Sequence, residues 1–114
     1  KQKKKKIFSK DLLKAVEFAN SGAYEEALRI CKKIKSKNLH NAAYFNVVGI
    51  VYRRLGLLDK AILNSKKAIQ IDKNILPAKM NIANIELQQG NIVQAIKLLE
   101  GIVSEKNSYQ EACC

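Results

Sequence analysis

Residues 46–62 read NVVGIVYRRLGLLDKAI, and the spacing of two small residues within this stretch recurs along the chain. Gly56 is followed five residues later by Ala61. The same pair appears 34 residues earlier and 34 residues later, as Gly22 with Ala27 and as Gly90 with Ala95. A register held in this way over most of a chain of 114 residues indicates a repeat architecture.

Counted from fourteen residues before each glycine, the repeats span residues 8–41, 42–75 and 76–109. Each repeat contains two apolar patterns of helical spacing separated by a short break; in the middle repeat they are Phe45, Val48, Gly49, Tyr52 and then Ala61, Ile62, Ser65, Ala68. The pattern predicts an all-α fold of three helical hairpins. We expect the three glycines to end the first helices, because a residue just past a helix end commonly takes a positive φ. Small residues at the same register are expected where the two helices of a hairpin cross closely: Ala15, Gly49 and Ala83 with Ala27, Ala61 and Ala95.

The middle repeat, from Asn46 to Gly56 and on through residues 59–62 and 67–72, resembles a tetratricopeptide repeat. The outer repeats depart further from the family pattern, since Asp11 and Lys79 stand at a position that is usually aromatic. The resemblance implies a right-handed superhelical solenoid of three helix-turn-helix hairpins plus a short C-terminal helical segment. It also implies a protein–protein interaction scaffold that binds a peptide segment in a concave groove.

In this family the first helices of the hairpins line the groove. Such a surface suits a peptide, because aliphatic side chains take its apolar residues and asparagines hydrogen-bond its backbone. The residues that the resemblance places in the groove are Leu12, Leu13, Val16, Asn46, Val47, Ile50, Met80, Asn81, Asn84 and Gln88.

A subclass of the family holds a C-terminal carboxylate with lysines, an arginine and asparagines. The corresponding positions carry no cation here, so a carboxylate would be desolvated without a partner charge. This argues against carboxylate binding of that kind; the five positions are Leu12, Val16, Val47, Pro77 and Asn81.

The formal net charge is +11, of which +5 lies in residues 1–6. Residues 1–7 are expected to form a basic disordered tail, and two interpretations of the basicity stay open: a bias of composition toward lysine, isoleucine and asparagine, or contact with a polyanion. The absence of tryptophan and the presence of only three arginines argue against nucleic-acid binding, because few residues are available to stack on bases.

Residues that could support catalysis are scarce. His40 is the only histidine and falls in a predicted inter-helix loop, so we expect no metal cluster and no histidine-assisted nucleophile. Cys31 is expected on the buried side of its helix. We therefore predict a protein that is not an enzyme and carries no cofactor. No apolar run is long enough for a membrane span and no secretory signal is present, which predicts a soluble cytoplasmic protein.

Two alternative functions remain. The chain could be the substrate-recognition arm of a larger enzyme of glycosyltransferase or sulfotransferase type, or a self-assembling module. Ile96, Leu99, Ile102 and Val103 recur at helical spacing near the C-terminus. Residues 110–114 are expected to begin a capping or further helix, too short to cover that surface. We therefore expect either a fragment of a longer array or pairing of a homo-oligomer through the C-terminal repeat.

Overall fold

The computed structural model describes the backbone of residues 8–113 and the side chains of residues 8–102. Within the described backbone the structure contains helices and turns and no strands, which confirms the all-α prediction. The tail expected at residues 1–7 lies outside this range. The helices are α1 (Lys10–Asn20), α2 (Tyr24–Lys33), a 3₁₀ turn η1 (Lys35–Lys37), α3 (Ala42–Arg54), α4 (Leu58–Ile71), α5 (Leu76–Gln88) and α6 (Ile92–Cys113).

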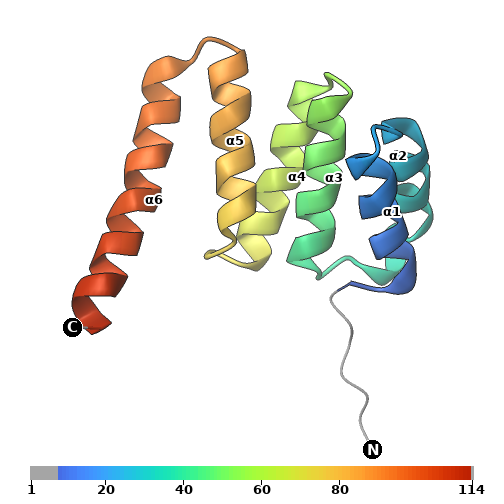
Figure 1. Cartoon of the computed structure of the whole chain (residues 1–114), viewed down its shortest axis with the longest axis horizontal. Helices are drawn as coiled ribbons and strands as arrows, with labels where there is room; N and C mark the ends of the chain where they lie inside the picture. Colours follow the sequence, from blue (N-terminus) through green and yellow to red (C-terminus); the bar gives the residue numbers. More distant parts are fainter. Residues whose placement is uncertain (1–7, 114) are drawn as a thin grey trace, which may run out of the picture.

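The helices pack as three consecutive pairs arranged in a row (Figure 1). α1 packs on α2, α3 on α4, and α5 on α6, and each pair contacts the next through α2 with α3 and through α4 with α5. α3 also contacts α1 and α5 directly. The first helices of the three pairs therefore lie next to one another along the row.

α6 differs from the expected C-terminal arrangement. It runs without a break from Ile92 to Cys113, so residues 110–113 extend α6 and do not form a separate short helical segment. Residues 102–113 contain no glycine or proline, the residues that most commonly end a helix. The prediction of a separate segment was therefore wrong, because nothing in this sequence requires a turn.

Each first helix ends in the same hydrogen-bonded turn around a glycine. Gly22, Gly56 and Gly90 have φ values of +87°, +81° and +82°. At the end of α3 the Gly56 N–H donates to the Arg53 carbonyl at 3.0 Å, and the Leu57 N–H donates to the Tyr52 carbonyl at 2.9 Å. This is the Schellman arrangement, which satisfies carbonyls that the helix leaves unpaired. The matching bonds at α1 and α5 run from Gly22 to Ala19, Ala23 to Phe18, Gly90 to Leu87 and Asn91 to Glu86.

Replacing Gly56 by alanine is expected to destabilise the protein by about 1–2 kcal/mol, because an L-residue is strained at this positive φ. A Cβ at Gly56 would meet no atom within 4 Å, so the loss would come from the backbone conformation alone. Gly101 provides a matched control, since it lies inside α6 and also has open space around it. Gly101→Ala is expected to stabilise by up to about 1 kcal/mol through helix propensity. Urea unfolding measures both changes, and a loss at Gly101 or no change at Gly56 would contradict this account.

The small residues predicted at the helix crossings are buried. Ala15, Ala27, Ala61 and Ala95 have no exposed surface, and Ala83 is 1% exposed. At Gly49 a Cβ would lie only 2.5 Å from the Ser65 hydroxyl oxygen and 3.2 Å from the Ala61 carbonyl oxygen. The predicted close crossing is therefore confirmed for α3 and α4, where a side chain at residue 49 would press on Ser65 and on the α4 backbone.

A buried tyrosine links the first two pairs. The Tyr44 hydroxyl donates a 2.6 Å hydrogen bond to the Cys31 carbonyl, and the Tyr44 ring meets the Phe45 ring edge to face with centroids 5.0 Å apart. Burial raises the pKa of the Cys31 thiol from 9.0 to about 11. Burial, with the neighbouring Cys31 and Tyr52 groups, raises the pKa of the Tyr44 hydroxyl from 10.0 to about 12. Both groups are therefore held neutral in the folded protein.

These raised pKa values predict a loss of stability in alkali. Below pH 9 both groups are protonated whether the chain is folded or unfolded, so their contribution is fully present. As the pH rises from 9 to about 11, the unfolded chain releases the Cys31 proton first and the free energy of unfolding falls by up to about 1.4 kcal/mol per pH unit. Cys31→Ala removes this contribution and should reduce the pH dependence of the free energy of unfolding between pH 9 and 11. The free energy of unfolding of both proteins is measured with urea at several pH values. If it falls equally in the two proteins from pH 9 to 11, this account is refuted.

The outer side of α1 is charged where the corresponding sides of α3 and α5 are apolar. Lys10, Lys14 and Glu17 are exposed on α1. Residues 34 and 68 positions further on are buried: Tyr44, Val48 and Val51 on α3, and Ala78, Ile82 and Ile85 on α5. α1 thus carries charged side chains at register positions that are buried in α3 and α5, and Leu13 on the same helix is also exposed.

Candidate functional site

The residues predicted to line the groove lie on α1, α3 and α5, three helices that are adjacent in the row. The structure separates them by burial into two groups. Leu12 is completely buried, Val47 is 8% exposed and Asn81 is 3% exposed. These three side chains lie in the interior, so they offer no surface to a ligand and their assignment to the lining of the groove has to be corrected.

The other predicted residues reach the surface. Leu13, Met80, Asn84 and Gln88 are exposed, and Val16, Asn46 and Ile50 are half-buried. Leu13 has the register of Val47 and Asn81, which are buried, and no pair precedes α1 in the described residues. Leu13 therefore belongs to the end of the row. Six predicted residues remain on the side shared by the first helices: Val16, Asn46, Ile50, Met80, Asn84 and Gln88.

Regular spacing aligns these six residues. Met80, Asn84 and Gln88 follow one another at intervals of four along α5, and Asn46 and Ile50 do the same along α3. Four residues beyond Ile50 on α3 lies Arg54, which is exposed and stands 34 residues before Gln88. Arg54 was missed in the sequence analysis, although its register was visible there. We call these seven residues the α1–α3–α5 face.

Asn81 has a structural partner on each side. Its Oδ1 accepts a 2.6 Å hydrogen bond from Arg53 Nε, and its Nδ2 donates a 2.8 Å hydrogen bond to Ser65 Oγ. The chain of bonds joins α3, α5 and α4 through one buried amide. Burial, with repulsion from Arg54, lowers the pKa of Arg53. Asn81 therefore fixes the distance between α3 and α5 from inside.

Gly49 gives a test of this network. Gly49→Ala would place a methyl group against Ser65 Oγ and force that hydroxyl away from Asn81. The substitution should destabilise the protein by about 1–3 kcal/mol, despite the higher helix propensity of alanine. In a Ser65→Ala background the hydroxyl is absent, so the cost of the same substitution should be smaller. A double-mutant cycle by urea unfolding measures the difference, and additive effects would exclude the contact through Ser65.

Asn46, at the centre of the α1–α3–α5 face, carries an unpaired acceptor. Its side-chain oxygen is buried and accepts no hydrogen bond from the described part of the chain. Buried acceptors without partners are uncommon in folded proteins and cost free energy. Because the side chain as a whole is only half-buried, a turn about its side-chain torsions can present the amide to a bound molecule.

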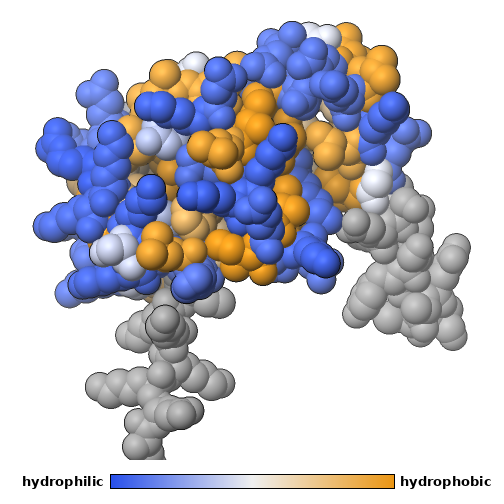
Figure 2. Space-filling model, turned by 180° about the vertical axis from the view of Figure 1, so that it is seen from behind, coloured by the Kyte–Doolittle hydropathy of each residue, from blue (hydrophilic) through white to orange (hydrophobic). Residues whose placement is uncertain are grey.

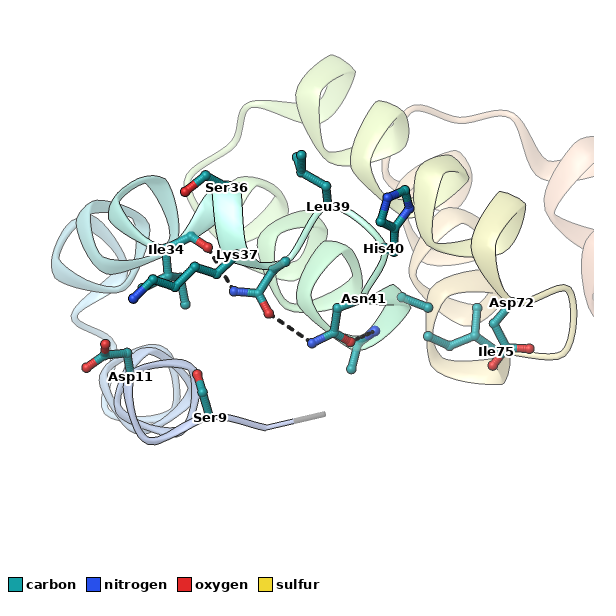
Figure 3. A pocket seen from close by; sticks show the side chains of 13 residues that line it. Ser9, Asp11, Ile34, Ser36, Lys37, Leu39, His40, Asn41, Asp72 and Ile75 are labelled. Carbon is teal, nitrogen blue, oxygen red and sulfur yellow. Dashed lines mark hydrogen bonds between the residues drawn. The ribbon is translucent and has the colours of Figure 1, made fainter. Parts of the chain in front are cut away.

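A separate cleft of about 770 Å³ lies at one end of the helices (Figure 3). Its walls come from the start of α1, the segment between α2 and α3, and the turn between α4 and α5. None of the predicted groove residues lines it, and sequence reasoning did not find it because its walls are distant in the chain. The lining residues are Ser9, Asp11, Ile34, Ser36, Lys37, Asn38, Leu39, His40, Asn41, Ala42, Ala43, Asp72 and Ile75.

Several polar groups of this cleft serve the fold. Asn38 Nδ2 donates to the Ile34 carbonyl at 2.8 Å, and Asn41 Nδ2 donates to Asn38 Oδ1 at 3.0 Å. Asn41 Oδ1 also accepts the first N–H groups of α3 and caps that helix. His40 is exposed in the loop before α3, as predicted, and carboxylates and a lysine are mixed along the walls. This mixture gives the cleft no single charge preference.

Among the side chains that the structure describes, no group of three or more histidine, cysteine, aspartate or glutamate residues could hold a metal ion. In the same residues, no helix is both long and apolar enough to cross a membrane. The sequence matches no protein-family model and no curated protein sequence.

Proposed function

We propose that this protein is a tetratricopeptide-type scaffold, a right-handed solenoid of three hairpins that binds a peptide segment without chemistry. The observation that carries the proposal is the α1–α3–α5 face itself. Val16, Ile50 and Asn84 occupy one position of the 34-residue register on three adjacent helices and all reach the surface, while Ala15, Gly49 and Ala83 directly before them are buried. Repetition of one surface pattern across neighbouring helices suits a ligand that extends across all of them.

The chemistry of the face suits a peptide with mixed side chains. Half-buried Val16 and Ile50 offer apolar contact, and the amides of Asn84 and Gln88 form no hydrogen bond with the described side chains or backbone. Primary amides both donate and accept, so they can pair with a peptide backbone. Arg54 adds one positive charge at the C-terminal end of α3. We therefore propose a ligand with aliphatic residues and an acidic group positioned for Arg54.

The framework beneath the face supports tight binding. Asn81 joins α3, α4 and α5, and the close α3–α4 crossing leaves no space for rearrangement at Gly49. A surface fixed in this way loses little conformational entropy when a ligand binds. The free, buried thiol of Cys31 is the form expected in a reducing compartment, which favours the cytoplasm as the place of action.

The proposal is tested by selecting peptides that bind the chain from a displayed library of random dodecapeptides. Substituting Asn84→Ala together with Gln88→Ala should weaken the selected peptides at least tenfold in fluorescence anisotropy, because their backbone loses hydrogen bonds. Arg54→Ala should weaken binding of acidic peptides and reduce its salt dependence. The exposed positions involved make unchanged thermal stability the expected result for all three substitutions.

The matched control removes two exposed glutamines from the second helices, Gln70→Ala on α4 and Gln94→Ala on α6. This control should bind the selected peptides as the wild-type chain does. If the control loses as much affinity as the Asn84/Gln88 variant, or if neither loses any, the α1–α3–α5 face is not the binding site.

A further inference from the structure

Charged side chains are distributed unequally between the two ends of the helices. α1, α3 and α5 start, and α2 and α4 end, at the lower edge of Figure 1. We call residues 8–11, 32–43 and 70–76, which include every residue that lines the cleft, the basic end. It carries two aspartates, Asp11 and Asp72, and six exposed lysines: Lys10, Lys32, Lys33, Lys35, Lys37 and Lys73.

The opposite end has the reverse balance of charge. Residues 17–26, 52–60 and 86–92 surround the turns that follow α1, α3 and α5. Their carboxylates are Glu17, Glu25, Glu26, Asp59 and Glu86, and their cations are Arg53, Arg54 and Lys60. A bias of composition toward lysine would raise the number of lysines at both ends, so it does not explain this distribution.

Helix dipoles do not explain the distribution either. A helix dipole favours cations at the C-terminus of the helix. α1 and α5 have their C-termini at the opposite end, yet neither helix carries a basic residue in its last turn. The lysines of the basic end therefore call for another explanation.

The six lysines lack compensating charges among the described side chains, because none of them forms an ion pair there. Asp72 Oδ1 accepts a 3.0 Å hydrogen bond from the Asn74 N–H, and Asp11 stands in the first turn of α1. Residues 1–6, which precede the basic end in the sequence, contain five further lysines. Like charges without partners repel one another and destabilise a compact protein. An anionic partner relieves this repulsion.

Exposed apolar side chains accompany the lysines. Phe8 is 42%, Leu39 51%, Ile71 41% and Leu76 47% exposed. They come from all three segments of the basic end, at or beside its turns. At the lower edge of Figure 2, apolar patches alternate with hydrophilic surface. The basic end thus combines positive charge with exposed apolar side chains, the two components by which proteins bind the surface of an anionic membrane.

The apolar surface on α6 lacks this combination. Of the pattern predicted there, Ile96 is exposed, Leu99 and Ile102 are half-buried, and the Val103 side chain lies outside the described residues. Lys97 and Glu100 balance each other between residues 92 and 102, so charge does not identify an occupant. Pairing of two copies through this repeat stays a prediction.

We propose that the basic end binds the surface of a membrane rich in anionic lipids. The lysines contact the headgroups, and the four exposed apolar side chains enter the boundary between headgroups and acyl chains. The three segments surround a cleft, so one extended surface can contact all of them together. A nucleic-acid backbone offers phosphates but no apolar environment, whereas the cytoplasmic leaflet of a membrane supplies both. Such binding is peripheral and requires no helix that crosses the membrane.

Flotation of the full chain with lipid vesicles tests the proposal. Vesicles of phosphatidylcholine with one third phosphatidylserine should bind the chain. Vesicles of phosphatidylcholine alone should bind it at least tenfold more weakly. Binding to the anionic vesicles should weaken as sodium chloride is added, because salt screens the attraction between lysines and headgroups.

Two variants separate the contributions of charge and apolar contact. Lys35→Gln with Lys37→Gln and Lys73→Gln should weaken binding to the anionic vesicles at least tenfold. Leu39→Gln with Leu76→Gln should weaken it at least fivefold. All five positions are exposed, so the melting temperatures of the variants should match that of the wild-type chain.

Matched controls make the same kinds of change outside the basic end. Arg29→Gln with Lys60→Gln and Lys97→Gln removes the same net charge. Leu57→Gln with Leu87→Gln replaces leucines of the opposite end that are 44% and 47% exposed. Both controls should bind the anionic vesicles as the wild-type chain does. The two basic-end variants should still bind library peptides selected on the α1–α3–α5 face, so the two proposals can fail independently.

Three results would overturn the proposal. The first is no binding of the wild-type chain to the anionic vesicles. The second is a loss of binding in the controls as large as in the basic-end variants. The third is full vesicle binding by the Leu39/Leu76 variant, because lysines alone would then make the basic end a site for any polyanion, an acidic polypeptide included.

Discussion

The close crossing of α3 and α4 is the constraint on which the rest of the structure depends. At Gly49 the backbone of α3 comes so near to α4 that a single methyl group would press on Ser65. This proximity brings Ser65 to the point where its hydroxyl can accept the bond from Asn81 of the next pair. The spacing inside one pair therefore controls how the following pair docks.

The buried amide of Asn81 connects this packing to the outer surface. It receives the Arg53 side chain from α3 and reaches Ser65 on α4, so one side chain holds three helices. A buried polar network of this kind restricts the packing to arrangements that satisfy every member. The α1–α3–α5 face inherits its geometry from this restriction, because Asn84 and Gln88 project from the same helix as Asn81.

The two ends of the row show how the same position can serve different purposes. Positions that are apolar and buried in α3 and α5 are charged and exposed in α1, which allows α1 to face water. α6 has not been modified in this way and keeps branched apolar residues on its outer side. Equivalent positions of the described helices therefore differ in burial and charge, although they share one register.

Much of the fold could be predicted from local chemistry. Gly22, Gly56 and Gly90 marked the helix ends because the positive φ of a Schellman turn favours glycine, and this requirement does not depend on distant residues. The helical spacing of apolar residues predicted the hairpins for the same reason. The end of α6 was mispredicted, since a repeat length suggests a turn but only a local breaking residue enforces one.

The sequence alone determined the helices and their pairing. Only the tertiary structure decided which of the predicted groove residues reach water. Asn81 and Asn84 are both asparagines on α5, yet one is buried between Arg53 and Ser65 and the other is exposed. Their roles differ because burial depends on helices distant in the sequence, which approach α5 only after the pairs have packed. The cleft lined by Ser9, His40 and Asp72 was invisible for the same physical reason, since packing alone brings its walls together.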